Sequence, residues 1–236
     1  MQPRDLFKIK AVKVKSVYSQ TEIRLFKKLD SPQKIQDFLS FKIRHNPAKD
    51  GVECRSPRMV LRFGKAHCME GALLAAAILE FHGHKPLLLD LRSAPDDLDH
   101  VVALFKRFGR WGAISKTNHI VLRYREPVYK SVRELALSYF HEYFLDSGKK
   151  TLREYSAPFD LRHFYPSLIL NPHPRPSPKG RGGTRVDWRT TEKDLAELPE
   201  YLDRARHYKI LTNRQIKNLR KADKIEIQAG RLVEWK

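Results

Sequence analysis

The run from Cys68 to Phe81 is the sequence feature that most constrains the fold. It reads CMEGALLAAAILEF, which is almost wholly alanine, leucine and other strong helix formers, with apolar residues all the way round. Gly83, two residues beyond it, is a helix stop signal. A helix without a polar face needs cover on several sides, so the run predicts a central helix buried inside a domain.

Cys68 is expected in the first turn of this helix, where unpaired backbone N–H groups and the positive end of the helix dipole meet. Lys65 and His67 just before it add positive charge. Such a field favours thiolate over thiol, so this position predicts a reactive cysteine with a pKa below that of a free thiol. The alternative is that Cys68 is a small buried hydrophobe, as many free cysteines are.

Three segments after the helix have the pattern of strands. Residues 86–91 form a short apolar run, and 100–105 and 111–115 flank a glycine-containing turn through 107–110, which is the pattern of a β-hairpin. The predicted fold class is therefore α+β, with the helix packed on a small antiparallel sheet and additional helices around it.

Residues that cap helices and residues that interrupt them indicate the remaining helices, strands and loops. Ser31-Pro32 begins a helix, Ser131 with Glu134 forms a capping box, and Thr191 and Thr212 each begin a helix with an acidic or amide residue three positions later. The elements expected from these signals are a strand at 9–14, helices at 32–43, 131–148, 191–206 and 212–224, and a loop over 45–59.

The chain divides into three parts. Residues 1–170 hold the predicted domain, and 171–184 read NPHPRPSPKGRGGT, in which alternating prolines and clustered glycines predict an insertion or linker. Residues 185–236 form a helical C-terminal extension, of which 201–236 carry 10 Lys or Arg residues against 4 acidic ones. This basic tail is the strongest candidate in the chain for nucleic-acid binding, and a solvated helical face is the competing interpretation.

Composition limits the partners and the compartment. Lys and Arg number 46 against 27 acidic residues, a formal net charge of +19, which indicates a nucleic acid or an acidic surface as a partner. The sequence has no run of 18 or more apolar residues and no signal-peptide core, so no membrane association and a cytoplasmic location are expected. The two cysteines, Cys54 and Cys68, lie in no metal-ligand cluster, and no metal or organic cofactor is expected.

The order of these elements resembles the transglutaminase-like superfamily of papain-like cysteine hydrolase folds. A cysteine begins a buried alanine-rich helix, a histidine begins a later strand, and a tryptophan leads the strand after that; the residues are Cys68, His100 and Trp111. The resemblance covers about residues 30–120. It implies that Cys68 is the nucleophile, that His100 is its base, and that an acidic residue on the following strand orients the imidazole.

The third position departs from the family pattern. Four residues after the tryptophan, where the family has aspartate, this chain has Ser115. A serine holds a histidine tautomer with one neutral hydrogen bond and stabilises an imidazolium less than a carboxylate does. Asn118 is the second candidate for the orienting role, by analogy with the asparagine of papain-like enzymes.

The function expected from the resemblance is a cysteine enzyme that forms a thioester with a peptide or amide substrate and passes it to water or to an amine. Hydrolysis is the expected direction, because bacterial relatives of this kind are mostly peptidases or amidases. Two alternatives stay open: a binding module that keeps the fold without turnover, and a basic protein associated with nucleic acid. The sequence does not indicate an oligomeric state.

Overall fold

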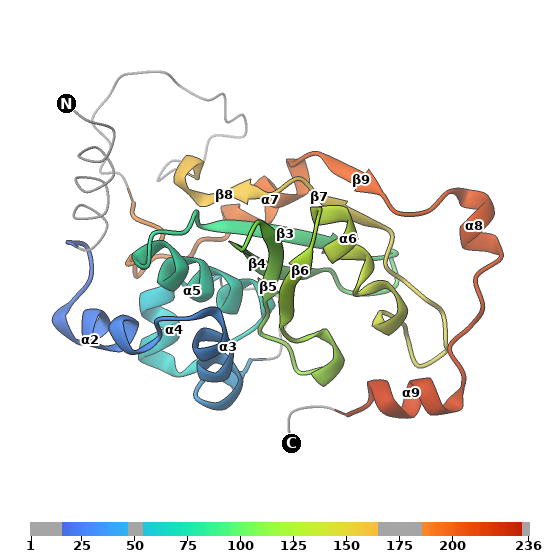
Figure 1. Ribbon diagram of the computed structural model, residues 1–236, viewed down its shortest axis with the longest axis horizontal. Helices are drawn as coiled ribbons and strands as arrows, with labels where there is room; N and C mark the ends of the chain where they lie inside the picture. The colour runs from blue at the N-terminus through green and yellow to red at the C-terminus, as the bar shows by residue number, and fades with distance from the viewer. Residues whose placement is uncertain (1–15, 47–53, 165–185, 233–236) are drawn as a thin grey trace.

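A seven-stranded sheet with helices on both faces organises the molecule (Figure 1). The structure is a computed structural model that describes residues 16–46, 54–164 and 186–232. The expected strand at 9–14 and the expected linker at 171–184 lie outside these residues.

Six strands follow one another across the sheet in the order β6-β5-β4-β3-β7-β9, and β8 also pairs with β3. Every pairing in this sheet is antiparallel. The strands are β3 (Leu87–Arg92), β4 (His100–Arg107), β5 (Arg110–Ile114), β6 (Arg125–Tyr129), β7 (Glu154–Ser156), β8 (Phe159–Asp160) and β9 (His207–Lys209). Strands β1 (Arg44–His45) and β2 (Lys65–Ala66) form a separate parallel pair. The predicted α+β class and the three predicted strands of the antiparallel sheet are thus confirmed.

The helices lie before, between and after these strands. They are α2 (Gln20–Lys28), α3 (Pro32–Phe41), α4 (Pro57–Phe63), α5 (Cys68–Phe81), α6 (Val132–Leu137), α7 (Glu197–Arg204), α8 (Asn213–Lys217) and α9 (Lys224–Gly230), with 3-10 turns η1 (Ile120–Leu122), η2 (Phe140–Glu142) and η3 (Leu161–His163). One face of the sheet packs on α5 and the helices around it, and the other packs on α6 and η2.

Helix α5 is the buried helix that the sequence predicts. All residues from Gly71 to Leu79 are buried, and Gly83 follows the helix with φ of 90°, a left-handed conformation that suits glycine. Within the helix, Gly71 allows a close approach of the chain, because a Cβ atom there would lie 2.2 Å from the Cβ of Lys116. The residue that follows Ser115 is therefore packed directly on α5.

The predicted hairpin is β4 and β5. Phe108 and Gly109 connect the strands with φ of 52° and 73°, so both central residues of the turn have positive φ. This is the type I′ geometry that matches the twist of a two-residue hairpin. Ala103 pairs with Ile114 in the resulting register, which places the end of β5 near the start of β4.

Four predictions of helices and loops need correction. The helix expected at 212–224 is only α8, which ends at its cap residue Asn218, and α9 begins separately at Lys224. The loop expected over 45–59 contains the start of α4, because Ser56 caps the helix and Pro57 is its first residue. The helix expected from 131 to 148 is only α6 followed by η2, although its apolar stripe, including Tyr139 and Tyr143, is buried as core. The helix expected at 191–206 is shortened to α7, whose third residue is Pro199, a position in the first turn where proline is tolerated.

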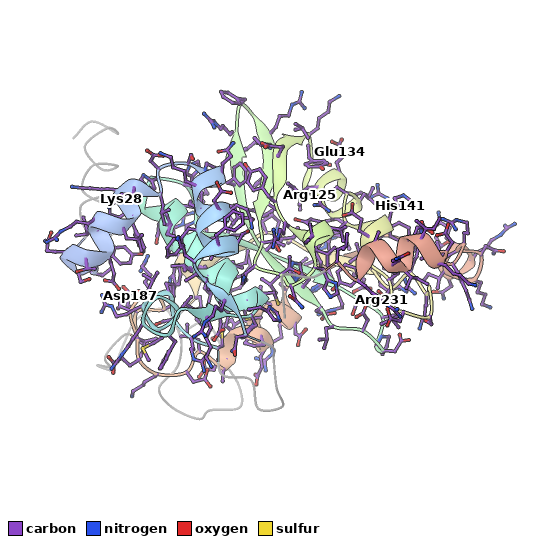
Figure 2. The ribbon with its side chains drawn as sticks, turned by 90° about the horizontal axis from the view of Figure 1, so that it is seen from below. Lys28, Arg125, Glu134, His141, Asp187 and Arg231 are labelled. Carbon is purple, nitrogen blue, oxygen red and sulfur yellow. The ribbon has the colours of Figure 1, made fainter. Side chains whose placement is uncertain are left out.

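The described part of the C-terminal extension is integrated with the domain. Strand β9 pairs with β7, and Trp188, Leu198 and Leu202 belong to the hydrophobic cluster around α5. Helix α9 then lies against the other side of the molecule, where Arg231 forms an ion pair with Asp146 at 3.0 Å (Figure 2). Among the described residues, the longest apolar helix falls short of what crossing a bilayer requires.

Candidate active site

Cys68 is the first residue of α5 and is partly exposed, although the helix behind it is buried. The helix start is fixed by the buried Glu70, whose carboxylate accepts hydrogen bonds from the backbone N–H of His67 at 3.0 Å and of Arg55 at 3.0 Å. Glu70 thereby satisfies donors at the helix N-terminus, in the third position of a capping box.

The resting state of Cys68 differs from the predicted thiolate. Burial raises the pKa of the thiol above its usual range, and the nearby Asp90 carboxylate raises it further. Hydrogen bonds from the backbone N–H groups of Val101, Met69 and Cys68 itself act in the opposite direction but are the smaller effect. The prediction of a lowered pKa is therefore wrong, because desolvation outweighs the helix N-terminus.

The second cysteine has a different environment. Cys54 has no exposed surface, and burial raises the pKa of its thiol well above the usual range. Its backbone N–H donates to Asp194 and its carbonyl accepts from the N–H of Leu195, which ties it to the C-terminal segment. Cys54 is therefore a core residue, whereas Cys68 is a partly exposed one.

His100 and Ser115 are in direct contact, as the resemblance implies for the base and the third residue. The distance between His100 Nε2 and Ser115 Oγ is 2.7 Å, and both residues are buried. Burial lowers the pKa of His100 to about 4, with smaller electrostatic contributions from His119 and Arg125. The imidazole is consequently neutral at physiological pH.

The structure does not bring the Cys68 sulfur and the His100 ring into a hydrogen bond. No hydrogen bond joins them among those of the described residues. The sulfur interacts with the N–H of Val101, the residue after His100. Val101 packs toward α5, whereas His100 pairs with Leu91, whose side chain belongs to the cluster on the opposite face. Side chains alternate along a strand, so the imidazole lies on the α6 side of the sheet.

Helix α3 holds Ser115 in place through Gln36, a residue that sequence reasoning did not identify. The Gln36 side chain donates to the Ser115 carbonyl at 2.9 Å and accepts from the Ser115 N–H at 2.9 Å. Both partners are buried, so Ser115 has a fixed position although β5 ends one residue earlier. Among the hydrogen bonds of the described chain, none joins Asn118 to His100, so the contact with the imidazole belongs to Ser115.

A histidine with a buried side chain lies on the α5 side of the sheet and was also not predicted. His207 on β9 has its Nε2 atom 3.0 Å from Asp90 Oδ2 on β3, and its Nδ1 atom 2.7 Å from the Ala205 carbonyl. Each of the two side chains is 5% exposed. Sequence distance hides this pair, because 117 positions separate its members.

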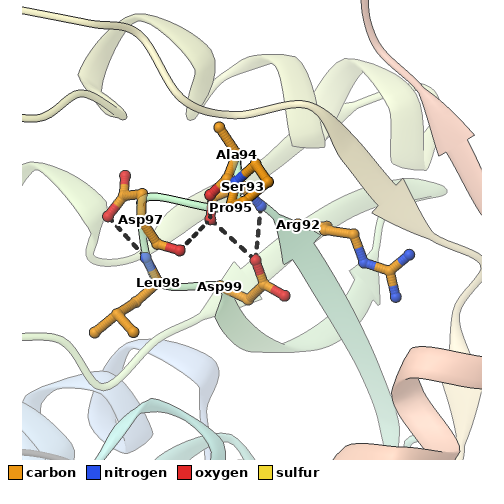
Figure 3. Close-up of a pocket in the computed structure, with 7 residues that line it drawn as sticks. All are labelled: Arg92, Ser93, Ala94, Pro95, Asp97, Leu98 and Asp99. Atoms are coloured by element: carbon orange, nitrogen blue, oxygen red, sulfur yellow. Dashed lines mark hydrogen bonds between the residues drawn. The ribbon is translucent and has the colours of Figure 1, made fainter.

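A pocket lies at the same end of the sheet, along the loop between β3 and β4 (Figure 3). It is lined by Arg92, Ser93, Ala94, Pro95, Asp97, Leu98 and Asp99. Ser93 fixes the loop through its backbone N–H and its hydroxyl, which both donate to Asp99 Oδ1, at 2.7 and 3.1 Å. Because Asp99 directly precedes His100, this pocket adjoins the candidate site.

Three carboxylates near the pocket lie close enough to one another to share a cation. Oxygen atoms of Asp90, Asp99 and Asp203 are all within 4.8 Å of each other. Each already has partners, since Asp90 contacts His207, Asp99 accepts from Ser93, and Asp203 forms an ion pair with Arg92 at 3.0 Å. The cluster is thus internally compensated and supplies no separate argument for a metal.

The comparisons with known proteins add no relatives to this picture. No protein-family model matches the chain, and no curated protein matches it.

Proposed function

We propose that the protein is a transglutaminase-like cysteine enzyme in which Cys68 attacks the carbonyl carbon of a peptide or amide. The observation that carries the proposal is the position of the Cys68 sulfur. Cys68 is a partly exposed residue at the start of a buried helix, and its sulfur has backbone N–H donors around it, one of them from the strand that begins with His100. A nucleophile, a base and oxyanion donors are the parts that acyl transfer requires.

In the proposed reaction, His100 accepts the thiol proton at Nδ1 while its Nε2–H donates to Ser115. The sulfur forms a bond to the substrate carbonyl carbon, and the N–H groups of Met69 and Val101 stabilise the oxyanion. His100 then transfers the proton to the leaving amine, and a thioester remains on Cys68. Water adds to the thioester and releases the acid and the thiol; an amine acceptor in place of water gives acyl transfer.

The neutral resting state is compatible with this chemistry. A base with a pKa of about 4 is unprotonated at pH 7, and its conjugate acid is a strong donor to the leaving group. Such a base is weak toward a thiol of raised pKa, so the proposal also requires substrate binding to bring the two pKa values closer. The sulfur and the imidazole are separated by the peptide unit between residues 100 and 101. Hydrogen bonds between catalytic groups often form only in the substrate complex. Because the imidazole lies on the α6 side of the sheet, the proposal requires the backbone at the start of β4 to rearrange when substrate binds, so that Nδ1 faces the sulfur while Nε2 stays on Ser115.

Peptide and amide substrates, with and without an amine acceptor, test the proposal on the purified protein. We expect release of the leaving amine by the wild type, loss of turnover in Cys68→Ser and His100→Ala, and full activity in Cys54→Ser if that variant folds. A covalent adduct on Cys68 detected by mass spectrometry identifies the thioester. A protein that is folded but neither turns over amides nor forms an adduct is instead the binding module that the sequence leaves open.

A further inference from the structure

We infer that the tip of the β4–β5 hairpin binds single-stranded nucleic acid, by stacking of bases on Phe108 and by ion pairing of the basic residues around it. The hairpin patch comprises Lys106, Arg107, Phe108, Arg110 and Trp111 of the hairpin, and Lys130, which follows β6. Strand β4 runs from His100 in the candidate active site to Arg107 at the tip, so the patch and that site lie at opposite ends of the strand. The inference therefore does not depend on the proposed function.

The hairpin tip projects from the body of the molecule. In Figure 2 the ends of the green strands reach beyond the helices on both sides of the sheet. Phe108 is 83% exposed, more than any other large hydrophobic side chain of the described residues. The ring thus packs on little of the protein and is open to a partner.

Two features of the tip oppose its folding. Phe108 has a φ of 52°, in the left-handed region that asparagine and glycine enter readily and that a bulky side chain enters at a cost in free energy. Arg107 and Arg110 are register partners, and like charges directly opposite each other in an antiparallel pair repel. A negatively charged partner removes this repulsion, and a partner with planar faces covers the exposed ring. Both features therefore point to a ligand, because neither stabilises the free protein.

The four cations of the hairpin patch form no ion pair with an acidic side chain of the described residues. The acidic residues that flank Lys130 in the sequence are Glu126 and Glu134, and the Glu134 carboxylate accepts from the Lys130 backbone N–H at 2.7 Å. In the basic C-terminal tail, by contrast, three arginines are in ion pairs: Arg204 with Glu200, Arg220 with Glu226 and Arg231 with Asp146, at 3.2, 2.7 and 3.0 Å. Neutralisation thus weakens the tail as a binding site and leaves the full charge of the hairpin patch for a polyanion.

Each aromatic ring of the hairpin patch has a cation next to it. The guanidinium carbon of Arg107 is 4.9 Å from the centre of the Phe108 ring, and the ammonium nitrogen of Lys106 is 5.1 Å from that of Trp111. Proteins that hold single strands without sequence preference combine such parts: aromatic rings on which bases stack, and cations that neutralise the phosphates.

Single strands fit the hairpin patch better than other anionic partners do. A duplex keeps its bases stacked on one another, so their faces are not open to Phe108. A lipid surface requires several apolar side chains that insert together, and residues 107–110 provide only one. An acidic peptide matches the charges but leaves the exposed ring unexplained.

Fluorescence anisotropy of labelled oligothymidylate and oligouridylate mixed with the full chain, at several salt concentrations, tests the inference. The slope of log Kobs against log salt concentration should be smaller in magnitude by about 1.4 in Arg107→Gln/Arg110→Gln, because two phosphate contacts are lost. The control Lys27→Gln/Lys28→Gln removes the same charge from exposed positions on α2 and should keep the wild-type slope. Equal reductions in the two double variants would overturn the inference, because binding would then follow net charge alone.

Phe108→Asn separates stacking from folding. Asparagine adopts the left-handed conformation more readily than phenylalanine, so thermal unfolding should show this variant to be at least as stable as the wild type. We expect its affinity for both oligonucleotides to fall about 5- to 100-fold, whereas Phe108→Trp should bind as the wild type does. A folded Phe108→Asn variant with wild-type affinity would overturn the inference.

Vesicles of phosphatidylcholine and phosphatidylserine test the lipid alternative with the same variants. Binding to these vesicles that depends on the hairpin patch, without binding to either oligonucleotide, would overturn the inference and make the patch a lipid-binding site. Cys68→Ser should bind oligonucleotides as the wild type does. A failure of amide turnover thus leaves the inference intact, and a failure of oligonucleotide binding leaves the proposed function intact.

Discussion

The Nε2 atom of His100 lies 2.7 Å from the Oγ atom of Ser115, at the position where the transglutaminase-like pattern has a carboxylate. A hydroxyl supports a neutral imidazole, whereas a carboxylate supports an imidazolium. We expect Ser115→Asp to raise the pKa of His100 from about 4 toward or above its ordinary value, and NMR titration of the ring measures the change. Ser115→Asn, of similar size but uncharged, is the control and should leave the pKa low; a low pKa in both variants would contradict the expectation.

The low pKa of His100 makes stability depend on pH. The unfolded imidazole binds a proton below its ordinary pKa of about 6.5, and the folded one only below about 4. Between these values the unfolded state binds more protons, so the free energy of unfolding rises with pH and is lost as pH falls through the window. This contribution is on the order of 3 kcal/mol. Denaturant unfolding at pH 4 and pH 7 should show a smaller difference for His100→Gln than for the wild type. An equal difference would mean that His100 does not titrate in this range.

Accessibility distinguishes the two cysteines. We expect iodoacetamide to label Cys68 in the native protein and Cys54 only after unfolding, because Cys54 is fully buried. The rate of labelling at Cys68 should still rise with pH above about 8.5, the usual pKa of a free thiol, because the pKa of Cys68 is raised. Mass spectrometry of digested protein gives the labelled site, with Cys68→Ser as the control. Native labelling of Cys54 alone would refute the assignment of Cys68 as the reactive residue.

The contact between Gly71 and Lys116 predicts a large effect of a small substitution. A methyl group at position 71 would lie 2.2 Å from the Cβ atom of Lys116. This Cβ atom is bonded to the backbone, so it cannot move away unless the backbone moves with it. Gly71→Ala should therefore destabilise the protein by about 1–3 kcal/mol, although alanine is the better helix former. The same substitution in a Lys116→Gly background should be neutral or stabilising. Denaturant unfolding of the four proteins in this cycle measures the coupling, and additivity would show that the clash is relieved elsewhere.

The sequence predicts well the elements whose signals are local. The α5 helix is apolar on all sides, the β4–β5 turn contains a glycine that accepts positive φ, and Ser31 and Ser131 cap the helices that begin after them. Each of these features depends on residues only a few positions apart. The prediction failed at Ser56-Pro57, because a Ser-Pro dipeptide begins either a turn or a helix, and the residues after it decide between the two.

Features that depend on distant residues were not predictable in this way. Gln36 is 79 positions from Ser115, and no local pattern marks a glutamine that binds both backbone groups of one residue. The resting state of Cys68 was also missed, because the helix N-terminus is visible in the sequence but the burial that outweighs it comes from the folded chain. The contact of His100 with Ser115, by contrast, follows from the hairpin register, which brings the start of β4 near the end of β5.

The pairing of β9 with β7 also bears on when the site is completed during protein synthesis. Helix α5 and strands β3 to β5 leave the ribosome first and can pair through short loops, whereas β9 must wait until residue 209 has been made. At the elongation rates of about 5–20 residues per second, the nascent chain exposes Cys68 and Asp90 for several seconds before His207 arrives. During this interval Asp90 lacks its hydrogen-bond partner, so the last strand to join the sheet is also the one that completes the pairing of this buried carboxylate.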